Sequence, residues 1–224
     1  GDYEKSTLDK KMNTPKLVGD IVSHWIKHGE DRPTVVFAVS IKHSKYIANI
    51  FKQNGIPSGH IDGEMPEIER EQQLEKLNKG EIKVLSNCMV LTEGWDQPKV
   101  SCVIIARPTK SYSLYLQMVG RSLRPAPNKK DTLIIDHSGC VYEHGFPEDV
   151  PKWELKTTVD RERKKKEPQP IERQPFTCVE CDTVYKPTKE DPACPNCAFI
   201  PTKKEKMILI QQGRLVELPK MKPN

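Results

Sequence analysis

Two arginines stand three residues apart in the segment QMVGRSLRP, which runs from Gln117 to Pro125. A planar guanidinium stays charged and can hold two phosphate oxygens at once. If this segment is helical throughout, Arg121 and Arg124 lie on one face and can point at the same anionic group. An isolated R-x-x-R pair is more often a pair of solvated side chains on a surface helix. The rest of the chain has to decide between these two interpretations.

A second candidate segment, LTEGWDQP, occupies residues 91–98. It follows a predicted strand and contains Gly94 and Asp96. A carboxylate beside a glycine-containing loop at the end of a strand can accept hydrogen bonds from a ribose hydroxyl. Asp96 could equally cap a turn, and its residue type alone does not separate the two roles.

Four of the seven cysteines form two C-x-x-C pairs with twelve residues between the pairs, namely Cys178, Cys181, Cys194 and Cys197. Two such turns can supply a closed tetrahedral shell for Zn²⁺. A closed shell leaves no position for a substrate, so we expect structural zinc that contributes folding free energy to a short segment. A pair of disulfides or a redox C-x-x-C are the alternatives. The remaining cysteines, Cys88, Cys102 and Cys140, are scattered through apolar segments, which favours buried thiols in a reducing compartment.

The elements that must position these residues alternate between short apolar strands and helical patterns. We predict strands at residues 34–39, 57–61, 82–85, 100–105 and 132–135, and helices at residues 15–28, 43–54, 67–78 and 112–123. Strands separated by helices of this length indicate an α/β fold with a parallel sheet and helices on both faces. Ligands of such sheets usually bind at the carboxyl ends of the strands.

The composition changes near residue 159. Residues 1–158 hold 22 Lys plus Arg against 21 Asp plus Glu, whereas residues 159–224 hold 14 against 10. We therefore expect a first domain over residues 1–158, a charged linker over 159–174, a zinc ribbon with a C-terminal hairpin over 175–218, and a tail over 219–224. No apolar run is long enough to cross a bilayer, and the polar N-terminus does not resemble a signal peptide.

Taken in order, the segments resemble the second RecA-like domain of superfamily 2 DEAD/DEAH-type helicases and translocases, in the branch with the XPB/Rad25-like and phage-encoded enzymes. The resemblance covers roughly residues 15–155. It rests on TVVFAVSIKHSKYIANIF for motif IV, SNCMVLTEGWDQPKV for motif V and QMVGRSLRP for motif VI. The segments HIDGEMPEIEREQQLEKLNKGEIKVL, IARPTKS and IIDHSGCVYEHG fit the same branch.

The resemblance implies roles for individual residues. Gln117, Arg121 and Arg124 match the glutamine and arginines of motif VI. Gln117 would belong to the nucleotide site, the two arginines would face the γ-phosphate of ATP with its Mg²⁺, and Arg124 would be the arginine finger. Gly94 and Asp96 would belong to the nucleotide site. Contacts with the backbone of the nucleic-acid strand would come from a further set of residues, which consists of Ser40, Lys42, His43, Asn87, Cys88 and Thr92. Motif V commonly has a Thr–Asp pair where this chain has Cys88-Met89, so backbone N–H contacts are expected there rather than side-chain contacts.

Two motifs of this superfamily are missing. The chain has no G-x-x-x-x-G-K-[ST] segment and no D-E-x-[DH] run, and both belong to the first RecA-like domain. We therefore expect this chain to be the C-terminal part of a longer enzyme that shares ATP and Mg²⁺ between two domains, and to hydrolyse no ATP alone. The expected partners are that first domain and DNA, or else RNA, in the cytoplasm of a prokaryotic or phage-infected cell. The alternatives are a non-enzymatic nucleic-acid-binding or docking module and the motor subunit of a restriction system.

The predicted ribbon is surrounded by lysines and contains Phe176, Tyr185 and Phe199. These three aromatic side chains could stack on bases. They could equally fill the small core of the ribbon, and the sequence leaves both interpretations open.

Overall fold

The structure is a computed structural model that describes residues 2–91, 97–149, 175–188 and 190–201. The chain divides into two units, Gly1–Val150 and Pro151–Asn224. The predicted charged linker and the predicted hairpin over residues 207–218 lie outside the described residues.

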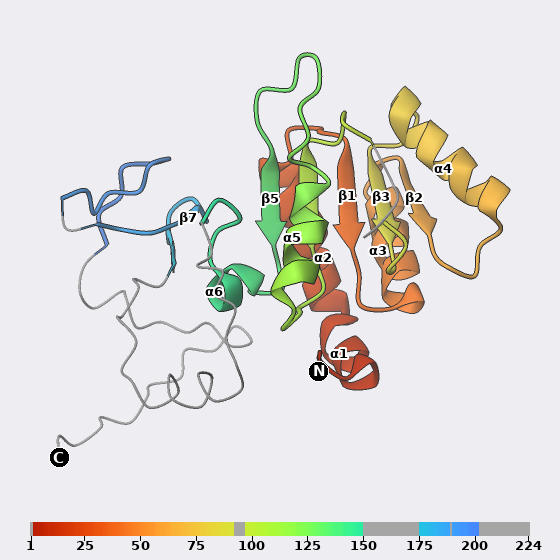
Figure 1. Cartoon of the computed structure of the whole chain (residues 1–224), viewed down its shortest axis with the longest axis horizontal. Coiled ribbons are helices and arrows are strands. Elements are labelled where there is room, and N and C mark those ends of the chain that lie inside the picture. Colours follow the sequence, from red (N-terminus) through yellow and green to blue (C-terminus); the bar gives the residue numbers. More distant parts are fainter. Residues whose placement is uncertain (1, 92–96, 150–174, 189, 202–224) are drawn as a thin grey trace, which may run out of the picture. The chain divides into compact units, whose positions relative to one another are not determined.

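The first unit is built on a parallel sheet of five strands in the order β2-β3-β1-β4-β5 (Figure 1). The strands are β1 (Thr34–Phe37), β2 (Ser58–Ile61), β3 (Val84–Asn87), β4 (Cys102–Ile105) and β5 (Leu133–Asp136). Val35 of the central strand pairs with Leu85 on one side and with Val103 on the other. All residues of β1, β3 and β4 are buried, as expected for strands covered on both faces.

The residues of this unit that the structure describes form six helices. They are α1 (Lys5–Met12), α2 (Pro15–His28), α3 (Ile41–Gln53), α4 (Glu67–Lys79), α5 (Tyr112–Gly120) and α6 (Cys140–His144). On one face of the sheet, α2 and α3 bury Ile21, Trp25 and Phe51. On the other face, α4 and α5 bury Leu77 and Met118. The predicted parallel sheet with helices on both faces is confirmed.

Local signals in the sequence explain several boundaries. Thr14 caps α2, since its side chain accepts a hydrogen bond from the Leu17 N–H at 3.3 Å, and Pro15 occupies the first helical position. Helix α4 ends at Lys79 and is capped by Gly80, which has a left-handed φ of +77° that suits glycine. The N–H groups of Glu81 and Ile82 bond back to the Lys76 carbonyl. β3 therefore begins at Val84 rather than at the predicted residue 82.

The structure corrects the predicted helix over residues 112–123, because α5 ends at Gly120. The Ser122 N–H bonds to the Val119 carbonyl at 3.1 Å, and the Leu123 N–H bonds to the Gly120 carbonyl at 3.3 Å. These bonds span three residues and tighten the chain into turns, and Pro125 disfavours helical backbone at the residue before it. Arg121 is consequently the C-terminal cap and Arg124 lies beyond the helix, so the two arginines do not share one helix face.

The described part of the second unit is a short antiparallel pair, β6 (Phe176–Thr177) and β7 (Val184–Tyr185), followed by turns that carry the last cysteine pair. Cys178, Tyr185 and Cys194 are buried together, and Phe176 and Phe199 pack against them. The rings of Phe176 and Tyr185 meet edge to face with centroids 5.8 Å apart. The three aromatic side chains therefore fill the small core of this unit.

Candidate functional site

The carboxyl end of β1 leads directly into the N-terminus of α3. Ser40 caps this helix, because its hydroxyl accepts the His43 N–H at 3.0 Å, and the same hydroxyl donates to the carboxylate of Asp9 in α1. Lys42 is exposed on the first turn of α3. The next strand in the sheet, β3, ends beside this turn, and the Cys88 thiol contacts the Val39 carbonyl at 3.8 Å. Ser40, Lys42 and Cys88 therefore lie at neighbouring strand ends.

Two of the residues that were predicted to contact a nucleic-acid strand have their side chains in the interior of the protein instead. His43 is 0% exposed, and its Nδ1 accepts the Val39 N–H at 3.4 Å. Burial lowers the pKa of His43 to about 4, although nearby Asp9 raises it slightly, so the imidazole is neutral at physiological pH. Asn87 is also 0% exposed, and its side chain bonds to the Val36 carbonyl at 2.9 Å and to the Leu91 N–H at 3.4 Å. In this structure these side chains fix the loops, and neither of them reaches the surface.

A buried polar chain that the sequence did not reveal supports the same edge. The Ser44 hydroxyl lies 2.7 Å from Nδ1 of His60 and 2.7 Å from the Ser86 hydroxyl, and His60 Nε2 lies 2.7 Å from the Asp62 carboxylate. Ser, His and Asp in this order can form a hydrolytic triad. Ser44 is fully buried and is already bonded to Ser86, so no substrate reaches it. The chain of hydrogen bonds joins α3 to β2 and β3.

The carboxyl end of β4 carries a group of donors within the segment IARPTKS. An Arg107 Nη2 lies 3.2 Å from the Asp2 carboxylate, the Thr109 hydroxyl lies 3.1 Å from it, and the Lys110 N–H donates to it at 2.9 Å. Burial tends to raise the pKa of Asp2, but these donors and the Tyr3 N–H together outweigh it and the pKa is lowered. Polar residues directly after an apolar strand are the only sequence signal that marks this group.

The arginines of the QMVGRSLRP segment lie at the other end of the sheet. Helix α5 follows β4 and runs back antiparallel to it, and the loop after α5 lies at the end of the sheet opposite to the strand arrowheads (Figure 1). Arg121 and Arg124 are half-buried there, and Gln117 is half-buried in α5. Thr92, Gly94 and Asp96 lie outside the described residues. The structure thus separates the candidate residues into two groups at opposite ends of the strands.

Lys129 anchors the segment that carries the two arginines. Its ammonium donates to the Arg124 carbonyl at 2.8 Å and to the Ser122 carbonyl. It also donates to the carbonyls of Val100 at 2.7 Å and Pro98 at 3.2 Å, two residues that precede β4. Burial lowers the pKa of Lys129. One lysine therefore fixes the end of the arginine segment against Pro98 and Val100, and nothing in its local sequence indicates this.

In the second unit the four predicted metal ligands come together. The Sγ atoms of Cys178, Cys181, Cys194 and Cys197 all lie within 4.8 Å of one another. Two of the cross-pair distances are 3.5 Å, from Cys178 to Cys197, and 3.6 Å, from Cys181 to Cys194. Four thiolates bound to a single tetrahedral ion at about 2.3 Å would be separated by similar distances. The donor set fits one metal ion.

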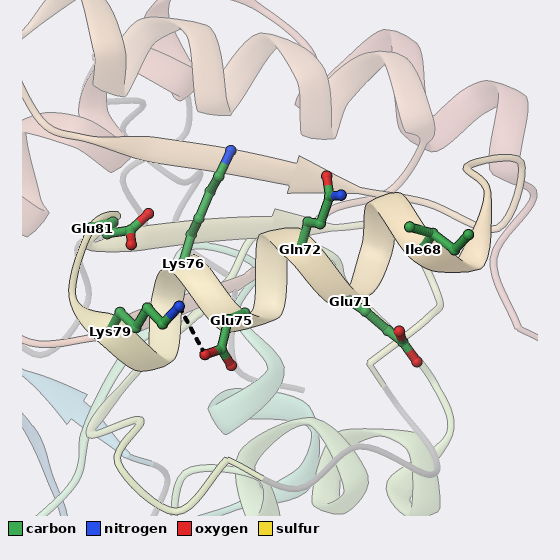
Figure 2. Close-up of a pocket in the computed structure, with 7 residues that line it drawn as sticks. All are labelled: Ile68, Glu71, Gln72, Glu75, Lys76, Lys79 and Glu81. Atoms are coloured by element: carbon green, nitrogen blue, oxygen red, sulfur yellow. Dashed lines mark ion pairs between the residues drawn. The ribbon is translucent and has the colours of Figure 1, made fainter.

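A depression of about 500 Å³ runs along α4 and is unrelated to these groups. Figure 2 shows that its side chains project from α4 and from Glu81 just beyond the helix, with an ion pair of 3.2 Å between Lys79 and Glu75. None of the candidate site residues lines it. We interpret it as the solvated face of α4. Within the described part of the chain, no helix is long and apolar enough to cross a bilayer.

Comparison with known proteins places the chain in a family. The model of the helicase conserved C-terminal domain matches residues 15–126. A 51.5 kDa protein of Lactococcus phage (isolate 7-9) is 31% identical over 225 residues, which cover 99% of this chain and 48% of the phage protein. The putative ATP-dependent helicase IRC3 of Saccharomyces cerevisiae is 35% identical over 142 residues, which cover 62% of this chain and 21% of the yeast protein.

A third relative, the putative mitochondrial ATP-dependent helicase irc3 of Schizosaccharomyces pombe, is 41% identical over 136 residues, which cover 60% of this chain and 22% of that protein. The chain thus spans about half or less of the length of the curated relatives it matches. The motif order, the parallel sheet and the family match agree. This chain belongs to the helicase conserved C-terminal domain family of the superfamily 2 helicases.

Proposed function

We propose that this chain is the second motor domain of an ATP-dependent nucleic-acid helicase or translocase and that it carries a Cys₄ zinc module. The observation that carries the proposal is the separation of the candidate residues into two groups at opposite ends of one sheet. A motor domain has to bind a nucleotide and a nucleic-acid strand at separate places and couple them through a rigid body. The two buried clusters that hold the sheet between its helices supply that rigidity.

The arginine segment would serve ATP hydrolysis. Arg124, and Arg121 beside it, would face the γ-phosphate of ATP held by another RecA-like domain, with Gln117 on the preceding turn. Their positive charge would stabilise the charge on the phosphoryl group in the transition state, an effect worth about 10³–10⁵ in rate in related enzymes. Gly94 and Asp96 would contribute to the same nucleotide site. Lys129 would hold the Arg124 backbone in place.

The opposite edge would hold a nucleic-acid strand, with DNA as the first candidate and RNA as the second. Ser40, Lys42 and Cys88 lie at neighbouring strand ends, where hydroxyl, ammonium and backbone N–H groups can contact phosphates. Opening and closing of the two motor domains during ATP turnover would move this edge along the strand. Because residues 1–158 are nearly neutral, binding would depend on placed contacts rather than on bulk charge.

The four cysteines would bind one structural Zn²⁺. The ion would cross-link the two C-x-x-C turns and supply folding free energy that a three-residue buried core cannot provide. Since the aromatic side chains are used for this core, binding of nucleic acid by the zinc module would depend on its surface lysines. Lys186 is such a residue within the described part of the module.

The test compares this chain alone with the longer protein that contains it, in steady-state ATPase assays with single-stranded DNA, duplex DNA or RNA. We expect turnover that a nucleic acid stimulates in the longer protein and none in this chain. Arg124→Ala should lower kcat of the longer protein by about 10³ with little change in KM. Lys130→Met, which removes an exposed charge outside both groups, is the matched control. ATP turnover by this chain alone, or an unchanged kcat in R124A, would contradict the proposal.

A further inference from the structure

The parallel strands β1 and β4 are neighbours, but after them the chain turns to opposite faces of the sheet. After β1 it enters α3, which packs with Val36 and Ile104 on one face of the sheet. After β4 it enters α5, which packs with Val35 and Ile105 on the other face. Loops that diverge in this way leave a crevice at the carboxyl ends of the strands, where α/β sheets usually bind their ligands.

The N-terminal segment of the chain lies against both of these loops. Helix α1 lies near the arrowhead end of β1 (Figure 1), and Asp9 of this helix accepts a hydrogen bond from Ser40 at the end of β1. At the end of β4, Arg107, Thr109 and the Lys110 N–H donate hydrogen bonds to Asp2, which also accepts one from the N–H of its neighbour Tyr3. Two carboxylates therefore satisfy donors at this edge.

The donors around Asp2 are built into the fold. Arg107 is only 8% exposed and Thr109 only 2% exposed. Nε of Arg107 has no hydrogen-bond partner among the residues that the structure describes. A buried guanidinium with an unmet N–H is costly unless a further acceptor completes it. The carboxylate of Asp2 thus satisfies this group incompletely.

A phosphate group suits these donors better than a carboxylate. A guanidinium, a hydroxyl and a backbone N–H are the groups that proteins use to hold phosphates of nucleic acids. A phosphodiester shares one negative charge over two oxygens, as the carboxylate of Asp2 does, and its tetrahedral phosphorus carries two ester oxygens as additional acceptors. A hollow of about 150 Å³ adjoins Thr109 and is lined by Ser138, Gly139 and Tyr142 among others, which leaves room beside the donors.

We propose that Arg107, Thr109 and the Lys110 N–H form a binding site for a backbone phosphate of the nucleic-acid strand, and that Asp2 occupies this site when no strand is bound. This inference rests on the proposed function of the strand-end edge. The nucleic acid then contacts the carboxyl ends of three adjacent β-strands, β3, β1 and β4. Binding of the strand displaces the carboxylate of Asp2, so the N-terminal segment competes with nucleic acid.

The experiment measures binding of a labelled single-stranded oligothymidylate to the 224-residue chain by fluorescence anisotropy over a range of salt concentrations. Arg107→Met should weaken binding and reduce the slope of log K against log salt by about 0.7, because one phosphate contact to a single strand is lost. Asp2→Asn should strengthen binding severalfold, because the competing carboxylate is removed. Combined with R107M, D2N should give no gain, since the site that Asp2 blocks no longer exists.

Circular dichroism confirms the folding of each variant. If R107M does not fold, D2N and the charge-retaining variant Arg107→Lys still test the proposed phosphate site. R107K should weaken binding and leave the slope of log K against log salt unchanged. A D2N chain with unchanged affinity, or a folded R107M chain with an unchanged salt slope, would overturn the inference.

The variant Lys42→Met distinguishes a failure of the proposed phosphate site from a failure of the proposed nucleic-acid edge. If K42M weakens binding and the Arg107 and Asp2 variants have no effect, the nucleic-acid edge stands and the proposed phosphate site does not. If no form binds the oligonucleotide, D2N included, the inference fails together with the proposed strand-binding edge.

Discussion

Replacing Lys129 by methionine removes the ammonium and keeps most of the aliphatic stem. In the structure this ammonium donates to the carbonyls of Ser122, Arg124, Val100 and Pro98. An ammonium has three N–H donors, so three bonds are shared among four acceptors. The variant leaves all four carbonyls without this partner.

The expected loss of stability follows from these contacts. A hydrogen bond to a charged group contributes about 1.5–3 kcal/mol, so three bonds at the lower value amount to roughly 4–5 kcal/mol. Partial burial of the ammonium opposes this gain by about 2 kcal/mol, the lower end of the cost of removing a polar group from water. We therefore expect K129M to lower the free energy of unfolding of the first unit by about 2–3 kcal/mol.

The assay is urea denaturation followed by circular dichroism, with Lys130→Met as the matched control. Lys130 is the exposed neighbour of Lys129, and its substitution should change the free energy of unfolding by less than about 0.5 kcal/mol. Hydrogen exchange should accelerate most in residues 119–131, because the anchored turn loosens before the sheet does. If K129M is as stable as K130M and its turn exchanges no faster, Lys129 does not anchor the arginine segment.

Three further predictions follow from other parts of the structure. Removal of zinc by a chelator, or Cys178→Ser, should make residues 175–201 sensitive to protease and leave the first unit folded; metal analysis that finds no zinc in the purified chain would contradict this. Burial lowers the pKa values of His43 and His137 to about 4, so the stability contributed by the neutral rings is complete above pH 6.5 and is lost as the pH falls towards 4. Urea denaturation should show a loss of about 2 kcal/mol per histidine between pH 7 and pH 5, with a flatter profile in His137→Gln. Gly59→Ala should destabilise the first unit by about 1–3 kcal/mol, because its Cβ would approach Ile82 Cδ1 to 2.9 Å; thermal unfolding at an unchanged temperature would refute this.

Features that depend on neighbouring residues were predictable from the sequence. The bounds of α2 follow from Thr14, Pro15 and the apolar spacing, and the structure has the predicted range of residues 15–28. The alternation of buried runs with helical patterns predicted the parallel sheet, because each element has to bury its own apolar face. The two C-x-x-C pairs predicted a four-thiol cluster, because each pair needs only a tight turn to bring its two sulfurs together.

The tertiary structure alone decided where the polar side chains of the candidate site lie. Arg107 and Asp2 are 105 residues apart in the sequence, and Lys129 meets the Pro98 carbonyl across 31 residues. Histidine is a residue type that can contact nucleic acid at the surface, but the packing of α3 against the sheet places the ring of His43 in the interior.

The sequence by itself determined the family, the sheet and the metal-binding pattern of this protein, since these depend on residue order and local periodicity. The end of α5, the burial of His43 and Asn87 and the anchoring of the arginine segment depend on packing between distant segments. No local pattern encodes such contacts, because they form only when the strands assemble and bring their ends together.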